Sequence, residues 1–466
     1  MPRSALVLLL IALASSLGLP AVHAEARAEA GAATGTAAAK GVGAPATPAA
    51  GAAAGSDLPA RIAAGVARTE ARVIETRRDL HTHPELGFAE KRTAALVAKR
   101  LRALGLAVRE GVGGTGVVAI LRGARPGRTV ALRADMDALP VTEQTGLPFA
   151  SKAKATWRGE TVGVMHACGH DAHVAMLLGA AEVLAGLRDD LPGTVVFLFQ
   201  PAEEGGGPGE TGGAEAMLAD GAFDDPVPEA VFGLHVGPGD VAGELSIVSG
   251  PVMAASDRFR ILVKGRQTHG ALPFAGIDPI PVAARIVLAI EALPAREIDV
   301  TTPAIVSVGA IHGGNRNNIL PEEVELIGTI RSFDEAARSA LHAKIERVAA
   351  KTAEASGATA SVEIVRGYGV LVNDPALTAF GRGVLERSLG PDKVHTGRPT
   401  TTAEDFSYFA NRVPGLFLWL GVRDPATPIE QAAPNHSPRF LVDERGLATG
   451  VRVLAELAVG FNASRD

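Results

Sequence analysis

The sequence contains a single cysteine, Cys168, among its 466 residues. One cysteine cannot form an internal disulfide, so no disulfide framework is expected to support the fold. Acidic residues number 51 against 45 basic ones, and no basic run alternates with aromatic residues. A nucleic-acid partner is therefore not expected. Beyond the N-terminal segment, no apolar run reaches the roughly 18 residues that a membrane-spanning helix needs.

The N-terminal residues have the pattern of an export signal. Arg3 precedes an apolar stretch over residues 5–17, and Val22-His23-Ala24 fits a cleavage site with small residues. An uncleaved anchor is the alternative, although the apolar stretch is short for one. We therefore predict a signal peptide over residues 1–24, an exported protein in a periplasm or the medium, and no stable membrane insertion after cleavage.

Residues 25–57 consist almost entirely of Ala, Gly, Thr and Pro, without apolar periodicity. Such a composition cannot bury enough apolar surface to fold, and it predicts a flexible tether. The folded part is expected to begin near Leu58. The length exceeds that of one ordinary domain, so two domains are expected, and the 47% hydrophobic content supports a large core.

Strands alternate with helices from residue 58 to residue 250. Helical apolar spacing covers residues 58–81 and 89–104, and a further helix is expected from His170. The short apolar runs expected to be strands cover residues 106–109, 116–121, 129–134, 194–199 and 230–234. This alternation predicts an α/β fold with a mostly parallel sheet and helices on both faces.

The segment from His166 to His173 reads HACGHDAH and holds three of the twelve histidines together with the only cysteine. Imidazole and thiolate are preferred ligands of borderline-soft transition metals. Gly169 lies between Cys168 and His170 and permits the backbone conformation that would turn both side chains towards one ion. The pattern favours a metal site over the alternative of a buried structural cysteine beside solvent-facing histidines.

Further candidate site residues follow the ends of the predicted strands. Asp135 and Asp137 follow the third strand, Glu203 and Glu204 follow the fourth, and His235 ends the fifth. The carboxyl ends of parallel strands form the crevice in which such sheets bind ligands. Taken singly, each residue could be a helix cap or a satisfied core residue, but together they indicate one site.

The pattern changes over residues 251–365, where the order strand, helix, strand, strand, helix, strand predicts a ferredoxin-like (βαββαβ) α+β unit. Residues 366–466 return to helices and short strands, including a buried strand over 415–420 and a closing helix over 442–461. We therefore expect one domain from residues 58–250 and 366–466, with the second inserted in it.

Eight stretches occur together with a recognisable order. They are LHTHPELGF, ALRADMDALPV, HACGHDAH, FQPAEEG, GLHV, QTHGALPFAGIDPI, NNILP and NHSP. In this order the chain resembles the metal-dependent amidohydrolases of the aminoacylase/carboxypeptidase metallopeptidase family, in the branch of hippurate hydrolase, N-acyl-amino-acid amidohydrolase and auxin-conjugate hydrolase. The resemblance covers essentially everything from Leu58 onward. It implies a metal-binding catalytic domain with an inserted dimerisation and lid domain, and a homodimer.

The resemblance also implies roles for individual residues. The metal ligands it implies are Cys168, His170, Glu204, His235 and His436. Glu203 would be the general base that assists attack of a metal-bound hydroxide on the amide bond of an N-acyl amino acid. His269 would act in the partner subunit's site, and Asn318 of NNILP would contact substrate. Two divalent ions are expected, of Zn, Mn, Co or Ni.

Two departures from the family pattern limit what is carried over. Asp135-Met136-Asp137 stands where the wider family has a His-x-Asp metal motif, so Asp135 and Asp137 are expected only to support the ligands. Phe274 stands where many relatives have a histidine, so no polar substrate contact is expected from it. The alternatives are a carboxypeptidase or dipeptidase that cleaves peptide bonds, and a non-catalytic metal-dependent binding protein.

Overall fold

The computed structural model describes residues 58–205 and 212–464. The expected signal peptide and tether, residues 1–57, lie outside the described residues. Within the described ranges, no helix is both long enough and apolar enough to cross a membrane.

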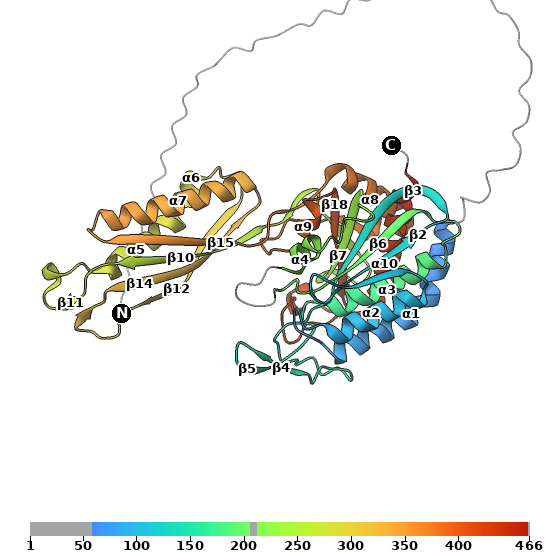
Figure 1. The fold of residues 1–466 in the computed structure, drawn as a ribbon, viewed down its shortest axis with the longest axis horizontal. Helices are drawn as coiled ribbons and strands as arrows, with labels where there is room; N and C mark the ends of the chain where they lie inside the picture. Colours follow the sequence, from blue (N-terminus) through green and yellow to red (C-terminus); the bar gives the residue numbers. More distant parts are fainter. Residues whose placement is uncertain (1–57, 206–211, 465–466) are drawn as a thin grey trace, which may run out of the picture. The chain divides into compact units, whose positions relative to one another are not determined.

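The larger sheet has eight strands in the order β1-β2-β6-β3-β7-β18-β8-β17 (Figure 1). Their bounds are Ala107–Val112 (β1), Gly116–Arg122 (β2), Arg125–Asp135 (β3), Pro192–Gln200 (β6), Ala230–Val241 (β7), Leu245–Ile247 (β8), Val394–Thr396 (β17) and Gly415–Arg423 (β18). The central strands β6, β3, β7 and β18 run parallel, and β1 and β2 pair antiparallel with their neighbours. β8 pairs antiparallel with β18 and parallel with β17. The mostly parallel sheet predicted from the sequence is confirmed.

Both faces of this sheet are buried because successive strand residues enter two different cores. In β6, Val195 and Phe197 belong to one core, and Val196 and Leu198 to the other. The first core is closed by α1 (Leu58–Thr82), α2 (Lys91–Ala103), α3 (His170–Ala185), α8 (Pro375–Leu389) and α10 (Leu447–Ala463). The second is closed by α4 (Gly213–Ala219) and α9 (Phe406–Ala410).

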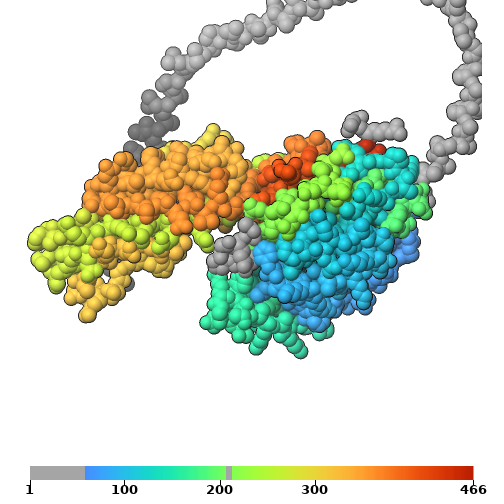
Figure 2. Space-filling model, in the orientation of Figure 1, coloured from blue at the N-terminus to red at the C-terminus, as the bar shows by residue number. Residues whose placement is uncertain are grey.

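Residues 255–366, called here the inserted domain, form a separate antiparallel sheet in the order β12-β14-β10-β15. Its elements are β10 (Ala255–Lys264), α5 (Pro279–Glu291), α6 (Leu293–Glu297), β12 (Ala304–Gly313), β14 (Glu323–Ser332), α7 (Glu335–Glu354) and β15 (Thr359–Arg366). Phe259, Ile261 and Val263 of β10 lie in a core with residues of α5 and α7. A short ladder of β11 (Thr268–His269) with β13 (Ile319–Leu320) holds two loops side by side at one end of the domain (Figure 2).

Two element ends differ from the prediction by about five residues or more. His235 does not end its strand, because β7 continues to Val241 through pairing with β18 that extends to Arg423. The closing helix begins at Leu447 rather than at residue 442, because Asp443 accepts a hydrogen bond from Arg445 N and starts a short 3₁₀ turn. The hairpin of β4 (Lys154–Trp157) and β5 (Glu160–Gly163) was not predicted, nor was the pair of β9 (Gly250–Met253) with β16 (Leu371–Asn373).

A matched pair of glycines tests the packing of the inserted sheet. A Cβ atom at Gly328 would lie 2.2 Å from Phe259 Cζ, whereas one at Gly309 would have its nearest neighbour at 3.9 Å. We expect Gly328→Ala to lower the free energy of unfolding by about 1–3 kcal/mol through overpacking. Gly309→Ala should change it by about 0.5 kcal/mol or less. Chemical denaturation of the full chain measures both, and equal losses would contradict the packing described.

Candidate active site

Five side chains with metal-binding atoms meet beside the carboxyl ends of the parallel strands. Cys168, His170 and His235 form one group, and Cys168, Glu204 and His436 form another, with ligand atoms within 4.8 Å of one another in each group. Cys168 belongs to both groups. The structure therefore brings together all five residues that the family resemblance indicated as ligands.

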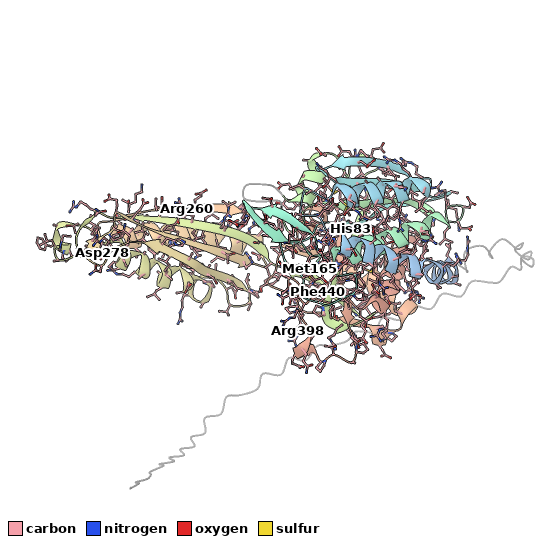
Figure 3. All side chains as sticks on the ribbon, turned by 90° about the horizontal axis from the view of Figure 1, so that it is seen from below. His83, Met165, Arg260, Asp278, Arg398 and Phe440 are labelled. Carbon is pink, nitrogen blue, oxygen red and sulfur yellow. The ribbon has the colours of Figure 1, made fainter. Side chains whose placement is uncertain are left out.

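The backbone before α3 makes the first group possible. Gly169 has φ 87°, and a Cβ atom there would lie 2.3 Å from Val236 Cγ2, so only glycine fits. Phe440, labelled in Figure 3, lies 3.4 Å from the same Cβ position. This turn places Cys168 Sγ 3.4 Å from Nε2 of His235 on β7.

The loop that carries His436 is fixed to the same turn. His436 N donates to Ala167 O at 2.8 Å, and Asn435 Nδ2 donates to Cys168 O at 3.2 Å. His436 itself has φ 70°, a left-handed conformation that is uncommon outside glycine. In this conformation its Nε2 lies 2.8 Å from Glu204 Oε1. A segment more than 230 residues after Glu204 in the chain is thereby added to the site.

The orientation of His170 leaves one ring nitrogen for a ligand. Its Nδ1 lies 3.1 Å from Asp137 Oδ1, and its Nε2 is buried with no hydrogen-bond partner in the described part of the chain. A carboxylate behind Nδ1 is the usual support of a metal-binding histidine. Burial lowers the pKa of His170, but the nearby carboxylates of Asp135 and Asp137 outweigh it and raise that pKa to about 10.

The surroundings of Cys168 also call for a cation. Burial and the carboxylates of Glu204, Glu203 and Asp135 raise the pKa of the Cys168 thiol well above its usual value. A thiolate in this position therefore needs a positive charge beside it. Thiol, imidazole and carboxylate groups around an unpartnered buried nitrogen fit divalent transition-metal ions.

Three side chains hold the turn that carries Glu203 and Glu204. Ala202 has φ 45°, and its N–H donates to Glu90 Oε1 at 2.8 Å. Glu204 N–H donates to Asp137 Oδ2 at 3.0 Å, and the Tyr368 hydroxyl donates to Glu203 O at 2.6 Å. Three consecutive residues of the turn thus each have a side-chain partner from a different segment, which stabilises a backbone conformation that alanine rarely adopts.

A buried ionic cluster lies on the other side of Glu203. The guanidinium of Arg133 donates to Asp135 at 2.6 Å, Glu404 at 2.8 Å and Asp405 at 3.0 Å. Carboxylate oxygens of Glu203, Glu404 and Asp405 lie within 4.8 Å of one another. Burial, followed by the charges of Glu404 and of Glu204, raises the pKa of Glu203 well above its usual value. Glu203 is therefore placed to hold a proton.

The three histidines of HACGHDAH have separate environments. His173 Nε2 accepts from Val236 N at 2.9 Å, so its Nδ1 carries the hydrogen that is donated to Asp135 Oδ1 at 2.5 Å. His166 is buried, and neither ring nitrogen has a hydrogen-bond partner among the described residues. Burial lowers the pKa of His166 to about 4, so the ring is neutral. Only His170 of the three lies in the groups that contain Cys168.

The structure places Asp135 and Asp137 beside the ligand groups, each in contact with a histidine of α3. It does not bring His269 and Asn318 to the cluster within this chain. Both are exposed in the inserted domain, where Gly270 N donates to Asn318 O at 2.8 Å and Ala271 N donates to His269 Nδ1 at 3.0 Å. The two residues therefore lie next to each other, and their roles stay predictions.

Some residues of the site were missed in the sequence. Sequence reasoning gave no role to Glu90, Arg133, His173, Tyr368, Glu404 or Asp405. Arg133 had a usable signal, since an arginine inside an apolar strand needs buried acidic partners. Tyr368 had none, because its contact depends on how distant segments fold together.

Comparisons with known proteins agree with this geometry. A profile of peptidase family M20/M25/M40 matches residues 131–459. Thermostable carboxypeptidase 1 of Saccharolobus solfataricus is 42% identical over 408 residues, which cover 87% of this chain and 99% of that protein. N-acyl-L-amino acid amidohydrolase of Geobacillus stearothermophilus is 42% identical over 331 residues, covering 70% of this chain and 86% of that protein.

Among solved structures, the Bacillus subtilis YxeP protein, a dinuclear metal binding peptidase, superposes with a TM-score of 0.71. It is 34% identical, with 84% of this chain and 98% of that chain covered. The family match covers more than half of the sequence, and the relatives align over most of their length. The chain therefore belongs to peptidase family M20/M25/M40 and is a hydrolase of amide C–N bonds.

Proposed function

We propose that this protein hydrolyses the amide bond of N-acyl amino acids. The observation that carries the proposal is the convergence of four ligand-type side chains on Cys168, with the buried carboxyl group of Glu203 beside them. The amidohydrolase relative from Geobacillus stearothermophilus supports this substrate class. The carboxypeptidase relative from Saccharolobus solfataricus supports a second candidate, hydrolysis of a C-terminal peptide bond. A non-catalytic binding protein is disfavoured because Glu203 is present.

Two divalent ions, held by Cys168, His170, Glu204, His235 and His436, would polarise the substrate carbonyl and lower the pKa of a water molecule. Glu203 would take a proton from the attacking water and deliver it to the leaving amine nitrogen. The hydrogen bonds of Glu90, Asp137 and Tyr368 to the backbone of its turn keep this carboxyl group in place. Asp137 would hold His170 with Nε2 directed at an ion.

We further propose that the active enzyme is an exported homodimer. β10 begins at Ala255, beside the end of β15, and reaches its far end at Lys264, about 30 Å away. His269 lies beyond that far end. We therefore expect His269 to enter the active site of the partner subunit rather than the active site of its own chain. Exposed apolar side chains on the inserted domain support association; they include Leu272, Phe274, Leu288, Ile305 and Ile311. The export proposal depends on residues 1–24 alone.

The role of Glu203 is tested by Glu203→Gln, which keeps the shape of the side chain but removes the base. Turnover of an N-acetyl amino acid should fall by about 10²–10⁴-fold. Metal content should stay at the wild-type value, because Glu203 is not one of the five ligands. Glu160→Gln, in the exposed hairpin, is the matched control and should leave turnover unchanged. Turnover within a few-fold of wild type, with metal retained, would falsify the assignment.

The role of Cys168 is tested by Cys168→Ser. A serine hydroxyl is neutral and hard, so metal affinity should fall by about tenfold or more. Because Cys168 belongs to both ligand groups, we expect occupancy of both ions to fall, and metal titration of chelator-treated protein measures this. Added metal should restore activity to chelated wild type. Wild-type metal affinity in the serine variant would instead support a structural cysteine.

The shared site is tested by mixing two inactive variants, His269→Ala and Glu203→Gln. Each mixed dimer has one site with both groups intact, so random mixing should restore about a quarter of wild-type activity. His312→Ala, an exposed histidine on β12, is the control and should be active by itself. Mixed dimers that form and remain as inactive as either parent would rule out the role across subunits.

A further inference from the structure

The sheet edge that carries the metal-ligand cluster continues into a cavity. In the strand order β6-β3-β7-β18-β8-β17, the cluster takes Glu204 from the turn after β6 and His235 from within β7, and Asp137 after β3 contacts His170. The cavity has a volume of about 460 Å³ and is lined by residues of β7, β18, β8 and β17 and of the segment after β17. Its size is that of a small-molecule site.

Two contacts join the cavity to the cluster. Trp419 of β18 lines the cavity, and its ring centroid lies 4.9 Å from that of His235. Asn435 also lines it and directly precedes His436, while its Nδ2 lies 3.8 Å from Cys168 Sγ. A substrate with its amide at the cluster would therefore have the cavity within reach of one half of the molecule.

The walls of the cavity favour a flat apolar group. The Trp419 ring supplies apolar surface in the cavity, and Gly237 and Gly239, which also line it, have no side chains to fill it. A Cβ atom at Gly237 would lie 3.1 Å from the Trp419 ring, and one at Gly239 would meet nothing within 4 Å. Side chains at positions 237 and 239 would fill the space beside the indole of Trp419. Because both residues are glycine, a ring-sized group of a ligand can pack on that indole.

Polar groups lie on the solvent side of the same cavity. Arg398 is exposed at the edge of its domain (Figure 3), and Asp240 is half-buried. Neither forms an ion pair with another described residue, so one charge of each sign is available to polar ends of a ligand. The cavity thus combines an apolar wall beside the cluster with polar groups towards water.

We propose that this cavity is the specificity pocket of the enzyme and binds a ring-bearing or similarly large apolar group of the substrate. The inference rests on the proposed function and narrows it to amide substrates that carry such a group on either side of the scissile bond. Gly237, Gly239 and Trp419 would determine the size of the accepted group. Arg398 and Asp240 would contact the part of the group nearest to water.

Substitutions at Gly239 test the proposal, with Gly239→Ala as the control for Gly239→Leu. The substrates are N-acetylglycine, N-benzoylglycine and N-acetylphenylalanine. Gly239→Leu should lower kcat/KM by about tenfold or more for a ring-bearing substrate, and by only a few-fold for N-acetylglycine. A loss confined to the benzoyl substrate assigns the pocket to the acyl group, and one confined to the phenylalanine substrate assigns it to the side chain. Equal effects on all three substrates would overturn the proposal.

A binding experiment separates failure of the pocket from failure of the proposed function. The chain has two tryptophans, so Trp157→Phe leaves Trp419 as the only indole. In this protein with Glu203→Gln added, N-benzoylglycine or N-acetylphenylalanine should change the Trp419 fluorescence, and Gly239→Leu should weaken that binding about tenfold. If wild type cleaves none of the substrates, the proposed function fails while a fluorescence change still supports the pocket. No response to either ligand would overturn the pocket.

Discussion

The arrangement of the site depends on buried negative charge at the ends of β3 and β6. Arg133 is the guanidinium that contacts Asp135, Glu404 and Asp405, and Glu203 lies in the same carboxylate group. One cation cannot neutralise these four groups, and burying unpaired charge is costly. Cations bound at the neighbouring cluster would offset the excess. Burial raises the pKa of the Cys168 thiol and of Glu203, and neighbouring carboxylates raise both further.

The fold supplies the precision that this chemistry requires. The parallel strands bring side chains from separate segments to one edge, and two of the residues that orient them, Glu90 and Asp137, are themselves buried. The turn of Ala202 is held by Glu90, Asp137 and Tyr368, each from a different part of the chain. β7 has two uses, since His235 lies in the cluster and Gly237 and Gly239 line the cavity. If the cavity binds the substituent as proposed, one strand would contribute to binding both the amide and the substituent.

Local patterns in the sequence predicted most of the scaffold, and the family resemblance indicated the full set of candidate ligands. Short apolar runs located the strands because both faces of each strand pack into cores, and HACGHDAH indicated a metal site through its residue types alone. The end of β7 was misplaced because pairing with β18 extends it beyond the apolar run. The Arg133–Glu404 contact joins residues 271 positions apart, and no local pattern reports such pairing. The reach of His269 concerns a second subunit and so cannot be read from one chain's contacts.

Loading the metal-free protein with Co²⁺ tests the central claim, that Cys168 is a ligand common to a two-ion site. Bound thiolate gives Co²⁺ an intense sulfur-to-metal charge-transfer absorption, and Cys168 is the only cysteine in the chain. The account predicts that this absorption grows until two equivalents of Co²⁺ are bound per chain, and that Cys168→Ser abolishes it. Tight binding of two equivalents without the absorption, or no specific binding at all, would contradict the account.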